Sequence, residues 1–282
     1  MSSSPLSSAQ AARVALAARL SALMQDAGLS GLELAERCGW HKSKSSRIAR
    51  GMTVPSDADI RAWCTACGAA DQAADLIAAS RTAESMYTQW REIHRDGMRR
   101  VHEKTVPLYQ RTKRFRVYAS NLMPGMTQTG PYASGLLRSI TDFQGTPDDV
   151  EQAVAARLDR SRVLADRAHQ FGLVLEEAVL YHAVCDDDGM AGQLEHLLTV
   201  MRQPNVSVGI IPLRCRRTVW PLEAFYAFDE SLVAVETLTA EINVTAPGEI
   251  RTYLKAFAEL SKLAVHGPQA RTLIASALSA FR

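Results

Sequence analysis

The residues best suited to chemistry lie in one short segment near the N-terminus. Basic and hydroxyl side chains are concentrated there within nine residues, and no acidic residue interrupts them. Long cations supply charge for phosphate groups, while serine hydroxyls can bond to phosphates or to base edges. The segment therefore predicts a nucleic-acid contact made by Lys42, Ser43, Lys44, Ser46, Arg47 and Arg50.

A helix-turn-helix is the element that would position these side chains. The sequence GLSGLELAERCGWHKSKSSRIARG, which runs from Gly28 to Gly51, predicts a short apolar helix over Gly31–Cys38. A tight turn around Gly39 follows, and then a second helix over His41–Arg50. In such a motif the N-terminal end of the second helix enters the major groove of DNA. On periodicity alone, a basic solvated helix in an ordinary bundle is the alternative.

Neighbouring segments predict a complete helical domain around this motif. Apolar residues recur at helical spacing, and glycines stand where several helices would end. Ser56 and Asp59 form a capping-box-like start for the fourth expected helix. Residues 1–98 are therefore expected to form an all-α, five-helix domain with a helix-turn-helix. Its expected helices are Ala9–Ala27, Gly31–Cys38, His41–Arg50, Asp57–Cys67 and one or two helices within Asp71–Met98.

The rest of the chain, residues 99–282, alternates between strand-like and helix-like segments. Phe171–Leu175, Met190–Arg202 and Val206–Ile211 follow one another as strand, helix and strand. That order predicts two parallel strands with a right-handed crossover. The fold class expected for the whole chain is therefore multidomain, with the helical domain followed by an α+β domain that has a small mixed sheet. Its other expected strands are Phe115–Tyr118, Ala224–Phe228, Leu232–Val235 and Glu241–Val244, and its closing helices are Pro247–Val265 and Pro268–Phe281.

Composition excludes several classes of protein. With 282 residues, 47% hydrophobic and 22% charged, the chain is neither fibrous nor disordered. It has no apolar run long enough for a membrane and no signal peptide, so we expect a cytoplasmic protein. Met1–Arg116 carries 18 Lys and Arg against 11 Asp and Glu, whereas Val117–Arg282 carries 14 against 19. A basic first half predicts a partner that is a polyanion.

Other motifs with possible chemistry have simpler interpretations. Cys64 and Cys67 form a C-x-x-C spacing inside a predicted helix, but a second pair of metal ligands is missing from that region. We expect them to pack in the core. His169, His182 and His266 are expected to be solvated or hydrogen-bonded rather than ligands, and the run Asp186–Gly189 is expected to be a polar turn. No fingerprint of a nucleophile, phosphate loop or dinucleotide site occurs, so we expect no enzyme activity, no cofactor and no metal.

The N-terminal segments resemble a known family of DNA-binding domains. From Leu20 to Gly68, the stretches AGLSGLELAERCGW, SKSSRIARG and PSDADIRAWCTACG are similar to the Cro/repressor-type (XRE) helix-turn-helix. The resemblance implies base or phosphate contacts by Lys42, Ser43, Ser46 and Arg47. The sequence departs from that family's pattern at two positions: Ser45 stands where Val or Ile is usually buried, and Gly31 where a polar residue is common.

The second half, about Pro107–Arg282, resembles the uncharacterised C-terminal domain of actinobacterial XRE regulators, including WhiJ-like and antitoxin-like members. The matching stretches include RVYASNLMPGMTQTGPYASGLL, QLEHLLTVMRQPNVSVGIIPL and EINVTAPGEIRTYLKAFAELSKLA. This resemblance implies transcription regulation and, in some members, a small acidic partner protein. It implies no catalytic residue.

The sequence thus predicts a sequence-specific transcriptional regulator that binds double-stranded DNA. One short helix reads few base pairs, so a homodimer on two half-sites is expected. Two alternatives remain open. One is an antitoxin-like protein that sequesters a small acidic partner and regulates its own operon. The other is a small-molecule sensor with an effector pocket in the C-terminal domain, near the ends of the parallel strands.

Overall fold

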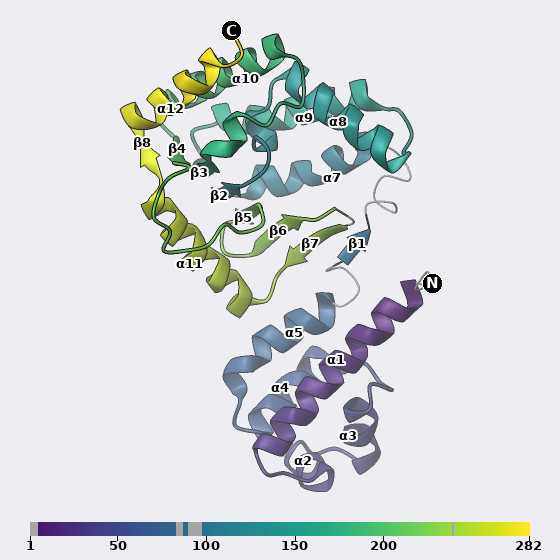
Figure 1. Ribbon diagram of the computed structural model, residues 1–282. Helices are drawn as coiled ribbons and strands as arrows, with labels where there is room; N and C mark the ends of the chain where they lie inside the picture. Colours follow the sequence, from purple (N-terminus) through teal and green to yellow (C-terminus); the bar gives the residue numbers. More distant parts are fainter. Residues whose placement is uncertain (1–4, 83–86, 90–97, 239) are drawn as a thin grey trace. The chain divides into compact units, whose positions relative to one another are not determined.

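Helices alone build the N-terminal part of the chain, and helices around a mixed sheet build the rest (Figure 1). The computed structural model describes residues 5–82, 87–89, 98–238 and 240–282. The chain divides into two units, Met1–Tyr87 with Asn243–Glu249, and Thr88–Ile242 with Ile250–Arg282. The expected combination of a helical region and an α+β region is confirmed. The exact boundary between residues 98 and 99 stays a prediction.

Between residues 5 and 82 the structure describes five α-helices, and a glycine follows each of the first four. At Gly39 the φ angle is +67°, a left-handed conformation that costs glycine little because it has no Cβ. The Gly39 N–H donates to the Glu36 carbonyl (3.1 Å) and the Trp40 N–H to the Ala35 carbonyl (2.8 Å), which closes the helix end. Gly28, Gly51 and Gly68 repeat this geometry. The helices are α1 (Pro5–Asp26), α2 (Gly31–Arg37), α3 (Lys42–Ala49), α4 (Asp57–Ala66) and α5 (Ala73–Thr82).

A small apolar core holds these helices together. Trp63 is its largest side chain and is 1% exposed. The Trp63 indole N–H donates to the Leu20 carbonyl at 2.9 Å, so the polar edge of the ring is satisfied inside the core. The core residues of the first unit are Leu16, Leu20, Leu29, Leu34, Ile48, Ile60, Trp63, Cys64, Ala73, Leu76 and Ile77.

The C-x-x-C pair lies at the end of α4, as the sequence predicts. Cys64 is fully buried in the core, and Cys67 is partly buried beside it. Burial raises the pKa of Cys64 to about 11. The thiol is therefore neutral near pH 7 and packs as a small apolar side chain. Among the residues that the structure describes, no group of three or more His, Cys, Asp or Glu side chains could hold a metal ion.

The second unit is organised by the mixed sheet, whose strand order is β1-β7-β6-β5-β2-β3-β4-β8. The predicted β-α-β unit is confirmed, since β3 and β4 pair in parallel. β2 pairs with β3 in parallel and with β5 antiparallel, and β5 and β6 form the predicted hairpin. The strands are β1 (Tyr87–Gln89), β2 (Arg114–Ala119), β3 (Gln170–Glu176), β4 (Val206–Ile211), β5 (Phe225–Phe228), β6 (Leu232–Glu236), β7 (Ala240–Val244) and β8 (Val265–His266).

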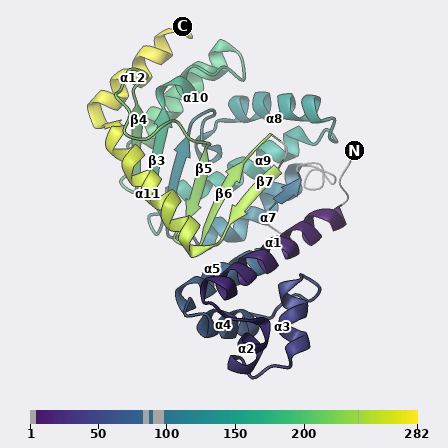
Figure 2. The same ribbon diagram turned by 60° about the horizontal axis from the view of Figure 1, so that its bottom comes forward.

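Helices cover both faces of this sheet (Figures 1 and 2). Phe115, Phe171 and Phe228 are neighbours on three adjacent strands, and they point to the same face of the sheet. They belong to a core to which α7, α8, α10 and α12 contribute. The opposite face carries Phe225, whose ring lies 5.1 Å from that of Tyr253 on α11. The helices of this unit are α7 (Met98–Arg111), α8 (Gly130–Gln144), α9 (Val150–Ser161), α10 (Asp187–Val200), α11 (Pro247–Leu263) and α12 (Gly267–Ser279).

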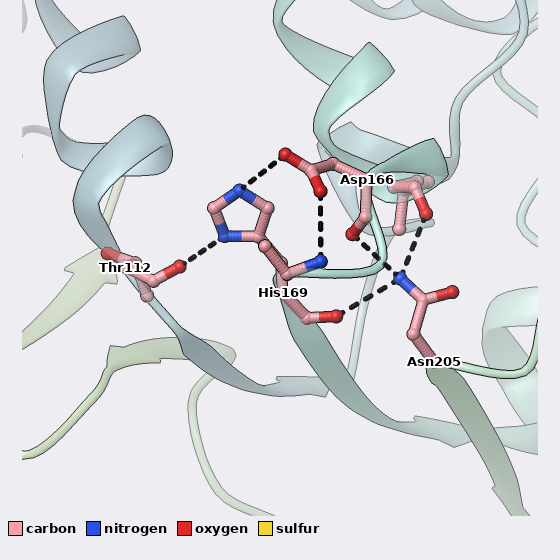
Figure 3. Close-up of polar contacts among 6 residues, drawn as sticks. Thr112, Asp166, His169 and Asn205 are labelled. Carbon is pink, nitrogen blue, oxygen red and sulfur yellow. Dashed lines mark hydrogen bonds and ion pairs between the residues drawn. The ribbon is translucent and has the colours of Figure 1, made fainter.

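A buried polar cluster fixes the starts of the parallel strands (Figure 3). His169 is 7% exposed, and its Nδ1 lies 2.6 Å from the Thr112 carbonyl at the start of β2. Its Nε2 lies 3.4 Å from the Asp166 carboxylate. The Asn205 amide donates to the carbonyls of Leu164, Asp166 and His169, each at 3.1 Å. Of the two states expected for this histidine, solvated or hydrogen-bonded, the structure shows the hydrogen-bonded one.

Several segments differ from the sequence prediction. The run Asp186–Gly189 was expected to be a polar turn, but α10 begins at Asp187, because the Asp186 side chain caps the helix by accepting from the Gly189 N–H. The helical prediction for Asp71–Met98 is wrong at Tyr87–Gln89, which forms β1, because a sheet edge is available for pairing there. Most of the intervening residues lie outside the described part of the chain. Met98–Arg111 form α7, which is not among the helices expected from the sequence, and Pro107 is accommodated within it.

The Cys64 environment gives a testable prediction. In the native protein at pH 8, iodoacetamide should leave Cys64 unmodified while it alkylates the partly exposed Cys215. Mass spectrometry of the digested protein measures both sites, and unfolding in urea should make them equally reactive. Alkylation of native Cys64 at the rate of Cys215 would contradict the assignment of Cys64 to the core.

Candidate nucleic-acid interface

The α3 helix divides cleanly into a buried side and an exposed side. Ser45 and Ile48 are 2% and 1% exposed, and they face the core of the first unit. Positions four residues apart lie above one another on a helix. This spacing places Lys42, Ser46 and Arg50 in one row and Ser43 and Arg47 in the next. Of these five, Ser46 is partly exposed and the others are exposed. Five of the six predicted contact residues therefore share one accessible surface, which we call the α3 surface.

The Ser45 hydroxyl joins the buried side of α3 to the start of α2. It lies 3.0 Å from the Gly31 carbonyl and 3.0 Å from the Lys42 carbonyl. This contact shows how a serine is accommodated at a buried position of α3. A buried hydroxyl is tolerated because backbone oxygens satisfy it, and the hydrogen bond gives α3 a directional link to α2 that an aliphatic side chain would not.

Lys44 differs from the other predicted contact residues. Its ammonium lies 2.6 Å from the Asp59 carboxylate on α4 and 4.5 Å from the centre of the Trp40 ring. The Trp40 ring in turn lies 6.2 Å from that of Trp63 in the core. Lys44 thus connects α3, the turn before it and α4, and its charge is already balanced inside the unit.

The Asp59 carboxylate is held in its charged form by several partners. Burial acts to raise its pKa, but hydrogen bonds from Lys44 and from the Ser56 N–H and hydroxyl outweigh burial and leave the pKa lowered. Ser56 and Asp59 also form a capping box, in which each side chain accepts from the backbone N–H of the other. One carboxylate therefore starts α4 and anchors α3.

Both ends of α3 are held as well. At the start, the His41 Nδ1 lies 2.8 Å from the Ser43 hydroxyl and accepts from the Ser43 N–H at 3.3 Å. At the end, the Ser21 hydroxyl of α1 donates to the Ala49 carbonyl at 3.4 Å. The α3 surface is consequently presented by a helix that three other helices fix in place.

The charge of the α3 surface is positive and unbalanced. Within the described part of the chain, Lys42, Arg47 and Arg50 form no ion pair with an acidic side chain. An ion pair of α3 joins Asp59 to Lys44, which is not part of the α3 surface. Three cations with hydroxyl neighbours on one rigid face can engage phosphates and base edges together.

Sequence reasoning did not identify Asp59 and Ser45 as the residues that position α3. Asp59 was expected only as the capping residue of α4, and no spacing rule relates it to Lys44, fifteen positions earlier. Ser45 carries the weak signal of a hydroxyl at a position where the helical pattern predicts burial. The assignment of the six predicted residues to DNA contacts stays a prediction.

The sensor alternative places a pocket at the carboxyl ends of the parallel strands. The structure has a polar cluster there whose groups bond to one another. The Tyr118 hydroxyl donates to Glu176 at 2.6 Å, and Arg217 binds both oxygens of the same carboxylate. Glu176 is 7% exposed. The pKa of Tyr118 is raised, first by burial and then by Glu176. Each group satisfies another, so this cluster offers no free charge to a ligand.

Replacing Lys44 should weaken folding more than replacing Lys42. Lys44→Met removes the ion pair with Asp59 and the contact with Trp40, which we expect to lower the free energy of unfolding by about 0.5–1 kcal/mol at pH 7. Lys42→Met is the matched control and should change it by less. Urea unfolding followed by circular dichroism measures both.

The effect of Lys44→Met should also depend on pH. Because the folded pKa of Asp59 is lowered, its charged form stabilises the fold above the ordinary aspartate pKa, and this contribution is lost on acidification. The difference between wild type and Lys44→Met should therefore shrink from about pH 5 to about pH 3. A difference that stays constant over this range would contradict the role given to Asp59.

Comparison with protein families assigns both parts of the chain. A family model described as a helix-turn-helix domain matches residues 15–77, which contain α2, α3 and the α3 surface. A second model, described as a domain of unknown function (DUF5753), matches residues 103–276, more than half of the chain. No curated protein matches the sequence. The N-terminal part is a helix-turn-helix domain typical of DNA-binding regulators, and the chain as a whole belongs to the DUF5753 family.

Proposed function

We propose that the protein is a sequence-specific transcriptional regulator that inserts α3 into the major groove of double-stranded DNA. The observation that carries this proposal is the α3 surface. It combines three unpaired cations with two hydroxyls on a helix whose opposite side is buried. In a helix-turn-helix the second helix occupies this position against the groove. The role requires recognition only, and no catalytic step.

The residues of the α3 surface divide between two tasks. Lys42 and Arg50 lie at the two ends of the helix, where they would reach phosphates on either side of the groove and supply affinity. Arg47 can bind a guanine through two hydrogen bonds, and Ser43 and Ser46 can bond to base edges or phosphates. Lys44 is the exception among the six predicted contacts. We assign it to positioning α3 through Asp59, with any DNA contact secondary.

Specific binding would use two copies of the chain. One α3 helix covers only a few base pairs, and useful selectivity normally needs two half-sites about one helical turn apart. A homodimer that works on DNA in the cytoplasm fits this requirement. Several finer points stay predictions. They are membership of the XRE class, the actinobacterial and WhiJ-like relationship, the antitoxin-like role with its small acidic partner, and the sensor role.

Two substitutions test the proposal. Arg47→Ala should weaken binding to a selected operator by about 1–3 kcal/mol and relax specificity at one base pair. Lys42→Ala should lower affinity for all sequences and reduce the slope of log K against log salt by about one unit. The operator is first selected from random duplexes with the full-length protein. Fluorescence anisotropy at several salt concentrations then measures the variants.

A control separates these effects from a general loss of charge or of fold. Arg202→Ala removes an exposed arginine that lies in the second unit, and it should keep wild-type affinity and salt slope. Unfolding curves should show that the Arg47 and Lys42 variants remain folded. Wild-type affinity in both variants would remove the α3 surface as the DNA contact.

A further inference from the structure

The first turn of α3 is capped by His41, the exposed residue that directly precedes the helix. Its backbone is extended, with φ −69° and ψ 138°, as is typical of a capping residue. The His41 Nδ1 accepts from the Ser43 N–H at 3.3 Å, which satisfies one of the backbone donors left free at a helix start. Ser, Thr, Asp and Asn are the usual residues at this position, so a histidine here is unusual.

The hydrogen bond from the Ser43 N–H decides which ring nitrogen of His41 carries the proton. A backbone N–H can only donate, so the His41 Nδ1 must offer a lone pair and is unprotonated. In an imidazole whose Nδ1 accepts, the proton lies on Nε2. The cap of α3 therefore fixes the tautomer of His41.

The same ring nitrogen fixes the direction of the Ser43 hydroxyl. The Ser43 Oγ lies 2.8 Å from the His41 Nδ1, which is within hydrogen-bond distance. Because Nδ1 has no proton to give, the Ser43 hydroxyl is the donor of this bond, and Nδ1 accepts from both the N–H and the O–H of Ser43. The single proton of this exposed hydroxyl is thus occupied, and only the lone pairs of its oxygen remain for another molecule.

An oxygen that can only accept matches few groups on the surface of a DNA duplex. Phosphate oxygens are acceptors, and so are N7 of the purines, O6 of guanine and O4 of thymine. Ser43 has no proton to offer any of them while it donates to His41. The hydrogen-bond donors of the major groove are the amino groups at N6 of adenine and N4 of cytosine. These amino groups are therefore the partners that suit the Ser43 oxygen.

We propose that His41 sets part of the specificity of α3 by orienting the Ser43 hydroxyl, so that Ser43 accepts a hydrogen bond from the amino group of an adenine or a cytosine. The inference rests on the proposed function, since it requires that α3 enters the major groove. It goes further by naming the group that Ser43 reads and by excluding a phosphate contact for this hydroxyl. His41 is a positioning residue, because it acts through Ser43.

This role gives a reason for a histidine at the start of α3. A Ser or Thr cap has a hydroxyl that can donate as well as accept, so it would leave the direction of the Ser43 hydroxyl open. The unprotonated ring nitrogen of His41 can only accept. One residue therefore both caps the helix and fixes the direction of the neighbouring hydroxyl.

Duplexes that lack single base groups test which group Ser43 reads. An operator is selected from random duplexes with the full-length protein, and the base pair in question is the one whose preference is lost in Ser43→Ala. Removing the amino group of the adenine or cytosine in that pair should weaken wild-type binding by about threefold to tenfold, because one hydrogen bond is lost. The same change should not weaken Ser43→Ala further. Removing the O4 or O6 oxygen of the paired thymine or guanine should affect both proteins equally.

Two substitutions at His41 separate the orientation of Ser43 from the capping of α3. Asn and Ser cap helices about equally well, so both variants should fold, which urea unfolding checks. The side-chain oxygen of Asn can only accept, so His41→Asn should keep the dependence on the amino group. A Ser hydroxyl can also donate, so His41→Ser frees the Ser43 proton, and removal of the O4 or O6 oxygen should then weaken binding as well. Ser46→Ala is the matched control on the α3 surface, and it should keep the wild-type dependence at this base pair.

The tautomer of His41 can be measured without DNA. Nitrogen-15 NMR of the full-length protein at pH 8 should show the His41 proton on Nε2. A proton on Nδ1 would overturn the inference whatever the function of α3.

The outcomes distinguish this inference from the proposed function. If no operator can be selected, or if Arg47→Ala and Lys42→Ala both bind like wild type, the DNA-binding role of α3 fails and the inference fails with it. If the operator depends on Arg47 but Ser43 shows no coupling to an amino group, the inference alone is wrong. A coupling of wild-type Ser43 to O4 or O6, or the same dependence in His41→Ser and His41→Asn, would also overturn it.

Discussion

An eight-residue helix is not stable by itself in water, and the helix-turn-helix unit is organised around that constraint. The α3 helix keeps its shape because its inner side is attached at several points. Ser45 bonds to the start of α2, Ile48 enters the core, and Lys44 reaches Asp59 on α4. These attachments use the residues that do not face outward. The exposed cations Lys42, Arg47 and Arg50 are not used in these attachments, so they remain available on a surface that could contact DNA.

The same constraint explains why the turns of this unit are glycines. Short helices pack around a small core only if the chain reverses direction within a few residues. A left-handed residue ends a helix in the least space, and Gly39 and Gly51 allow it without the strain of a Cβ. The core itself is modest and depends on a few large side chains. Trp63 serves it twice, by packing and by its hydrogen bond to Leu20 across α1 and α4.

Local patterns made much of this fold predictable. Glycines after helices, the capping box of Ser56 and Asp59, and the apolar runs of β3 and β4 each leave a signal within a few residues, and each appears in the structure where expected. Contacts between distant positions leave no such signal. The pair Lys44 and Asp59 could not be predicted, because the meeting of their helices depends on the packed core. The α7 helix was not among the helices expected from the sequence, and Pro107, which usually interrupts a helix, is accommodated within it.

The second unit shows how differently buried charge can be handled in one domain. At Glu176, the carboxylate, Tyr118 and Arg217 satisfy one another, so the cluster stabilises the ends of β2 and β3 and needs nothing else. Arg157 and Arg160 instead donate to neutral side chains, Gln128 and Thr105, while the negative charge of Glu236 acts on Arg157 although the two form no ion pair. The positive charge of the arginines strengthens these two hydrogen bonds, because a bond from a guanidinium is stronger than one between neutral groups. The two arginines thereby attach α9 to Thr105 on α7 and to Gln128, which holds the helices together beside the sheet.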